Sequence, residues 1–194
     1  MKAVILAGGA GWRIGEETET RPKPMLEVGG KPLLWHIMKL YERHGITDFV
    51  VCLGYKGHVV EEFFADLGEP WNVTLADTGE TAMTGARLRR VLPHVGAEPF
   101  CLTYGDGVAD VDLTALVAHH RRQGTTATVT AVRPPARFGA LRIDGERVTS
   151  FAEKPPESEP WRGSLNGVGA ERKIREQIGS VRRRRSSNRE SARA

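Results

Sequence analysis

Glycines dominate the segment that follows the first apolar run of the chain. This run, residues 2–6, leads directly into LAGGAGWR, residues 6–13. Because glycine has no side chain, its backbone approaches a ligand closely and successive N–H groups converge on phosphate oxygens. Arg13 adds a guanidinium group whose fork matches a phosphate. The segment therefore indicates a phosphate-binding loop, with an ordinary tight loop as the alternative, and it matches neither the P-loop nor the dinucleotide-binding spacing.

A lysine held between two prolines follows this loop, in the segment Arg21-Pro-Lys-Pro. Proline fixes its own backbone dihedral, so we expect the segment to be stiff and Lys23 to point in one direction. A lysine held near a phosphate loop neutralises charge that builds up during phosphoryl transfer. The alternative is a solvated loop lysine without a chemical role.

A carboxylate follows the apolar run at residues 100–104, in the sequence Gly105-Asp106-Gly107. Open α/β sheets bind their ligands at the carboxyl ends of the strands, which is where Asp106 is expected to lie. A carboxylate there makes a hard oxygen ligand for Mg²⁺ shared with substrate phosphates. The alternative is that Asp106 only forms a turn. Asp112, further on, is expected to cap a helix.

The elements that position these residues alternate between short apolar runs and stretches of helical period. Strands are expected at residues 2–6, 48–53, 72–76, 100–104 and 126–132. Helices are expected at residues 32–44, 58–66, 86–92 and 113–123, the first with a stripe of Leu33, Ile37, Leu40 and Tyr41. A hairpin is expected at residues 140–151. The alternation predicts an α/β fold with a doubly wound, mostly parallel, Rossmann-like sheet flanked by helices.

This pattern fails toward the end of the chain. Prolines interrupt residues 155–160, and no strand-like apolar run follows Gly167. Residues 162–194 carry a net charge of +7, whereas the whole chain of 194 residues carries +4. We therefore expect a domain over residues 1–166, with a sheet that is incomplete at the C-terminus. A basic, disordered tail is expected over residues 167–194.

Composition excludes several classes of protein. Hydrophobic residues make up 40% of the chain, which permits a buried core, yet no apolar run approaches the roughly 20 residues of a membrane helix. The first residues lack the features of a signal peptide, so we expect a cytoplasmic protein. Cys52 and Cys101 are too few for a disulfide framework and are expected to be buried, reduced thiols. The acidic body of the chain gives no reason to expect nucleic-acid binding.

Eight motifs along residues 1–167 occur in the order found in one enzyme family: LAGGAGWR, RPKPMLEVGGKPLLWHIM, GYKG, EPWNVTLADTG, MTGARLRRV, TYGDGVAD, RFGAL and FAEKP. On these motifs the chain resembles the sugar-1-phosphate nucleotidyltransferases. WHIM, EPWNVTL and TYGDGVAD point to the cytidylyl branch of the family. The resemblance implies an Mg²⁺-dependent reaction in which glucose 1-phosphate attacks the α-phosphorus of CTP, giving CDP-glucose and pyrophosphate.

The same resemblance implies roles for individual residues. Catalytic roles fall on Arg13, Lys23 and Asp106, and Asp106 is also the implied Mg²⁺ ligand. Nucleotide contacts fall on Leu6, Ala7, Gly8, Gly9, Gly11, Thr84, Gly85, Arg87 and Gly105. Contacts to the sugar and its phosphate fall on Glu153, Lys154 and Asn166. These roles supply positioning and charge rather than covalent chemistry.

The chain departs from the family pattern at four places. Trp12 replaces a small hydroxyl residue, and Ala82 stands where serine is common. The connection from Asp66 to Glu69 is short where the cytidylyl branch carries an insertion that contributes to subunit contacts, which argues against the homo-oligomer of the family. After Gly167 an arginine-rich sequence, of the kind produced by an altered reading frame, replaces the part that holds a second Mg²⁺-binding aspartate.

These departures leave three hypotheses. The leading one is an enzyme of the cytidylyl branch, with activity lowered by the loss of the second aspartate. The next is an inactive remnant that binds a nucleotide or a sugar phosphate without turnover. The last is an RNA-associating protein that acts through the arginine-rich tail and binds RNA in a salt-sensitive way.

Overall fold

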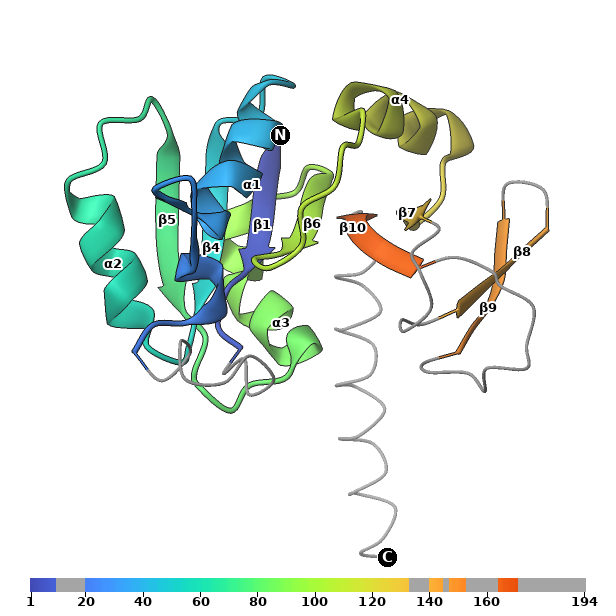
Figure 1. Cartoon of the computed structure of the whole chain (residues 1–194). Helices are drawn as coiled ribbons and strands as arrows, with labels where there is room; N and C mark the ends of the chain where they lie inside the picture. Colours follow the sequence, from blue (N-terminus) through green and yellow to red (C-terminus); the bar gives the residue numbers. More distant parts are fainter. Residues whose placement is uncertain (10–19, 133–139, 145–146, 153–163, 171–194) are drawn as a thin grey trace, which may run out of the picture.

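The computed structural model describes residues 1–9, 20–132, 140–144, 147–152 and 164–170. Within these residues strands and helices alternate along the chain (Figure 1). The helices are α1 (Leu33–Glu42), α2 (Gly57–Ala65), α3 (Thr84–Val95) and α4 (Leu113–Gln123). The strands of the main sheet are β1 (Lys2–Leu6), β4 (Asp48–Leu53), β5 (Asn72–Asp77), β6 (Phe100–Tyr104), β7 (Ala127–Val132) and β10 (Ser164–Ala170).

The main sheet has the strand order β5-β4-β1-β6-β10-β7. Strands β5, β4, β1 and β6 are parallel neighbours, and β10 lies antiparallel between β6 and β7. The chain winds outward from β1 to β4 and β5, and then returns to the other side of β1 as β6. This reversal confirms the doubly wound, mostly parallel sheet. It also places a crevice at the carboxyl ends of β1 and β6.

Alternate side chains of the central strands pack on opposite faces of the sheet. Ala3 and Ile5 of β1 lie in a core shared with α1, α2 and the start of α4. Val4 and Leu6 of the same strand lie in a second core, which α3 covers. Because both faces are buried, these strands read as continuous apolar runs rather than as an alternation of apolar and polar residues.

Helix α1 buries one stripe of its surface against the sheet. The buried residues are Leu34, Ile37, Met38 and Tyr41, which recur at the spacing of one helix face. The expected stripe included Leu33 and Leu40, and both are only partly buried. The helix therefore lies where it was predicted, but it is rotated about its axis from the predicted face.

Two smaller sheets complete the described structure. A short antiparallel pair joins β2 (Glu27–Val28) to β3 (Lys31–Pro32), beside the 3-10 turn η2 (Lys23–Met25). Strands β8 (Ala140–Asp144) and β9 (Arg147–Ala152) form an antiparallel hairpin, which confirms the hairpin expected there. In the described part of the chain, no helix is long and apolar enough to cross a membrane.

Strand β10 corrects the expectation that no strand follows Gly167. It runs from Ser164 to Ala170, across the predicted boundary at residue 166, and its last residue pairs with Phe100 of β6. Backbone hydrogen bonds to two neighbouring strands hold it in the sheet, so a run of small residues is sufficient. The remainder of the predicted tail, residues 171–194, lies outside the described residues.

Candidate active site

A cleft opens at the carboxyl ends of β1 and β6, where the sheet topology places the crevice. It encloses about 890 Å³, part of it open to solvent. Its lining comes from segments that follow β1, β5 and β6 and from the turn η2. The lining residues are Leu6, Ala7, Gly8, Gly9, Lys23, Pro24, Glu80, Thr81, Ala82, Met83, Thr84, Arg87, Tyr104 and Asp106.

Lys23 and Asp106 form an ion pair inside this cleft. Lys23 Nζ donates a hydrogen bond of 2.7 Å to Asp106 Oδ2, although 83 residues separate them in the sequence. The two side chains are 29% and 38% exposed, so both charges are open to a ligand in the cleft. The structure thus brings together the lysine and the carboxylate to which the family resemblance assigns catalytic roles.

The proline-rich segment around Lys23 is anchored to the loop that carries Asp106. Pro24 and Met25 of the turn η2 are buried. A Cβ atom at Gly105 would lie 2.9 Å from Pro24 Cγ, so the close approach of the two segments requires glycine there. The N–H of Gly105 donates a 3.0 Å hydrogen bond to the carbonyl of Leu6, at the end of β1. These contacts hold the backbone next to Lys23 against the loop that carries Asp106.

Arg87 is buried below the cleft, with only 5% of its surface exposed. Its guanidinium group donates four hydrogen bonds, all to acceptors of the protein itself. Burial lowers the pKa of this side chain. Arginine nevertheless carries its charge in proteins. The resemblance assigned Arg87 to nucleotide contact, whereas here its donors hold the loops that line the cleft.

The other predicted site residues have different positions. Thr84 is the first residue of α3 and lines the cleft, whereas its neighbour Gly85 does not. Asn166 belongs to β10, of which the structure describes the backbone and not the side chains. The remaining predicted site residues lie outside the described residues: Gly11, Arg13, Glu153 and Lys154.

Several cleft residues were missed by the sequence analysis. Met83 is 79% exposed and Tyr104 is 48% exposed, which is unusual for large hydrophobic side chains. Both line the cleft, together with Glu80 and Thr81. Their only signal in the sequence is position, because Met83 directly precedes α3 and Tyr104 directly precedes Gly105-Asp106.

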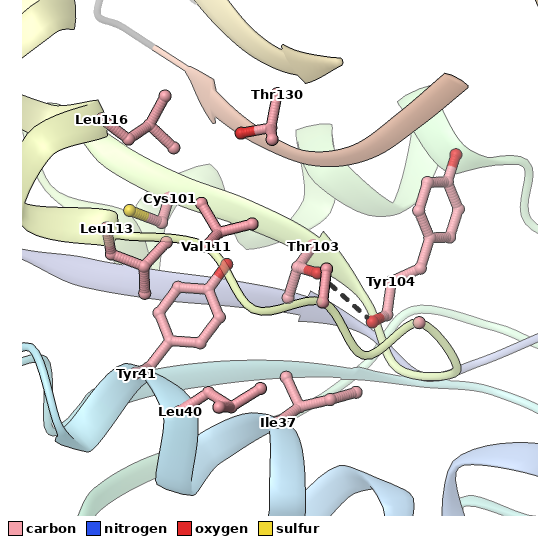
Figure 2. A pocket seen from close by; sticks show the side chains of 12 residues that line it. Ile37, Leu40, Tyr41, Cys101, Thr103, Tyr104, Val111, Leu113, Leu116 and Thr130 are labelled. Carbon is pink, nitrogen blue, oxygen red and sulfur yellow. Dashed lines mark hydrogen bonds between the residues drawn. The ribbon is translucent and has the colours of Figure 1, made fainter. Parts of the chain in front are cut away.

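A second cavity lies behind the Asp106 loop, between α1, β6 and α4. Figure 2 shows Ile37, Leu40 and Tyr41 rising from α1 toward this cavity, with Thr130 on its far side. None of the described residues that line it carries a charged side chain. A polyphosphate requires cationic or N–H partners, so the cleft at Lys23 and Asp106 is the better candidate for the active site.

Comparisons with known proteins agree with this geometry. Residues 2–170 match the family model described as nucleotidyl transferase. Glucose-1-phosphate cytidylyltransferase of Salmonella typhi is 53% identical over 178 residues, which cover 80% of this chain and 69% of that protein. The probable glucose-1-phosphate cytidylyltransferase of Bacillus subtilis (strain 168) is 38% identical over 188 residues, covering 86% of this chain and 72% of that protein.

A solved structure shows the same fold. UDP-glucose pyrophosphorylase complexed with UDP-glucose superposes with a TM-score of 0.78 at 18% identity, over 92% of this chain and 79% of that one.

The alignment with the Salmonella protein extends over 178 positions but includes only 80% of the 194 residues of this chain. The Salmonella protein therefore contains residues within the aligned region that this chain lacks.

Proposed function

Because the chain belongs to the nucleotidyl transferase family, we propose that it transfers a cytidylyl group from CTP to glucose 1-phosphate and releases pyrophosphate. The choice of CTP and glucose 1-phosphate is supported by the 53% identity to the Salmonella typhi cytidylyltransferase. The structural observation that carries the proposal is the meeting of Lys23 and Asp106 at 2.7 Å in a cleft next to a glycine-rich loop.

The reaction needs no nucleophile from the protein. A phosphate oxygen of glucose 1-phosphate forms a bond to the α-phosphorus of CTP, and the bond from that phosphorus to the bridging oxygen of pyrophosphate breaks. Negative charge moves onto the leaving pyrophosphate, where the Lys23 ammonium group donates hydrogen bonds that strengthen in the transition state. Backbone N–H groups near Gly8 and Gly9 hold the phosphates in line for this displacement.

One carboxylate of the cleft fits a magnesium ion. Asp106 offers hard oxygen atoms and is partly open to the cleft. Among the described residues, no three His, Cys, Asp or Glu side chains lie together so that they could hold a metal ion. Mg²⁺ in such enzymes commonly takes one or two carboxylates and completes its coordination with water and substrate phosphates. Asp106 would hold the ion, which when bound neutralises charge on the triphosphate.

Calorimetric titration with CTP and Mg²⁺ tests this function at the level of binding. We expect Lys23→Met to weaken CTP binding about tenfold or more, because the variant removes a cation that faces the phosphates. Lys31→Met is the matched control, since Lys31 lies on β3, outside the cleft, and its removal should leave the dissociation constant unchanged. Equal CTP affinity in wild type and both variants would contradict the proposed site.

A further inference from the structure

The side chain of Arg87 connects loops at the ends of three strands of the sheet. Nη2 donates to the carbonyl of Gly8, after β1, at 2.8 Å, and to the carbonyl of Glu80, after β5, at 2.9 Å. Nη1 donates to the carbonyl of Leu53, the last residue of β4, at 3.0 Å. It also donates to Thr78 Oγ1 at 2.7 Å. One planar group thus joins all three segments at the floor of the cleft.

Two glycines make room for this guanidinium group. A Cβ atom at Gly8 would lie 2.1 Å from Arg87 Nη1, and a Cβ atom at Gly54 would lie 2.5 Å from the same nitrogen. Thr78, which is fully buried, reinforces the arrangement because its hydroxyl group donates to the carbonyl of Leu53 at 2.5 Å. The loop backbone is therefore shaped around the arginine side chain.

The acceptors of Arg87 are carbonyl and hydroxyl oxygens. Among the residues that the structure describes, no carboxylate forms an ion pair with it. Burying a cation costs free energy unless its N–H groups donate hydrogen bonds. Here three backbone carbonyls and the hydroxyl group of Thr78 accept them. Displacing any one of the three loops would leave a charged donor without an acceptor, so each loop is held in register with the others.

We propose that Arg87 is a positioning residue that fixes the floor of the cleft through the backbone of three loops. It acts on the nucleotide through the glycine-rich loop at Gly8 and through the segment at Glu80, rather than by contact of its own. We call the hydrogen bonds from Arg87 to the three loops the bracket. The effect on CTP binding rests on the proposed function, whereas the bracket itself does not. A lysine at this position keeps the charge but lacks the planar fork, so it cannot join the three loops.

Amide hydrogen exchange of the ligand-free protein tests the bracket directly. We expect Arg87→Met and Arg87→Lys to speed exchange about tenfold or more in peptides that contain residues 8–9, 54–55 and 78–82. Arg89→Met is the matched control, because Arg89 is exposed on the same helix. Unchanged exchange in the Arg87→Lys protein, which retains most of the buried side chain and the charge, would overturn the proposal even if Arg87→Met fails to fold.

The link to nucleotide binding is tested by a double-mutant cycle between Gly8→Ala and Arg87→Lys. We expect each change alone to weaken CTP binding about tenfold and the pair to weaken it little further, because both disturb one arrangement. Additive losses, or weaker binding with unaltered exchange, would show that Arg87 contacts the nucleotide itself and would refute a positioning role. If the wild type fails to bind CTP, the proposed function fails, while the exchange experiment still decides the bracket.

Discussion

Lys23 and Asp106 satisfy each other's charge in the cleft, and the proposed function requires both to change partners when a triphosphate binds. Their side chains are partly exposed, and an ion pair of this kind contributes about 1 kcal/mol or less to stability. Holding the two segments together therefore does not depend on the pair, since the contact between Pro24 and Gly105 does so. The pair places a cation and a carboxylate side by side in the cleft, as the proposed function requires.

Asp106→Asn is expected to separate catalysis from stability. Removing the charge of the only carboxylate proposed as a metal ligand should lower the rate of pyrophosphate release by about 10²- to 10⁴-fold. The urea midpoint should change little, because the lost ion pair is weak. Asp110→Asn, an exposed change in the same loop, serves as the control and should retain wild-type turnover. A full rate in the Asp106→Asn protein would remove this residue from the mechanism.

The sequence predicts which residues meet in the cleft better than it predicts how they are held. Lys23 and Asp106 were identified because a glycine-rich loop, a proline-fixed lysine and a carboxylate after a strand each carry a recognisable pattern. The bracket at Arg87 was not predicted, because three of its acceptors are backbone carbonyls, which every residue possesses. A pattern of side chains cannot reveal a partner that is part of the main chain.

At the scale of elements, the buried parallel strands were predicted best. The bounds of β1, β4 and β6 agree with the expected strands, because strands covered on both faces are continuous apolar runs. The position of helix α1 and the burial of Ile37 and Tyr41 were predicted correctly. The other two buried residues were not, since LLWHIM contains apolar residues on several sides of the helix. Strand β10 was missed because its small residues give no apolar signal.

Glu69 attaches helix α1 to the short connection before β5. Its carboxylate accepts hydrogen bonds from Trp35 Nε1 at 2.8 Å and from Lys39 Nζ at 2.6 Å. Lys39 also lies 5.2 Å from the ring centre of Trp71. The hydrogen bonds from Lys39 and Trp35 lower the pKa of Glu69 below its ordinary value.

Glu69→Gln is expected to lower the urea midpoint of unfolding at pH 7. Because the folded pKa of Glu69 is lowered, its contribution to stability is present above pH 4.5 and is lost as the pH falls through the folded pKa. The difference between wild type and variant should therefore shrink in acid. Glu62→Gln, an exposed change on α2, is the control for a general charge effect. A difference that stays constant from pH 7 to pH 3 would argue against this role.

Across the whole molecule, the main sheet is buried on both faces, and it encloses ionisable groups that are uncharged in the folded protein. Burial raises the pKa of Cys52 to about 12 and that of Cys101 to about 11, and it also raises the pKa of Tyr41. Both thiols are free, as the cysteine count predicted, and both are buried. The unfolded chain releases these protons at lower pH than the folded protein does.

The free energy of unfolding is therefore expected to fall as the pH rises above 9. Below the unfolded thiol pKa the contribution is complete, and it is lost between that value and the folded pKa values of about 11 and 12. Each thiol contributes at most about 1.4 kcal/mol per pH unit to the slope. Urea unfolding between pH 8 and pH 10.5 measures this slope. The doubly substituted Cys52→Ala, Cys101→Ala protein should show a shallower one, and equal slopes would contradict this explanation.

The cleft at the carboxyl ends of β1 and β6 is proposed to transfer a cytidylyl group. The most direct measurement is pyrophosphate release by the purified chain with glucose 1-phosphate and Mg²⁺, supplied with CTP, UTP or dTTP in parallel. The proposed function predicts turnover that is fastest with CTP and is abolished by chelating Mg²⁺. A cooperatively folded protein that releases no pyrophosphate with any of the three nucleotides would contradict it.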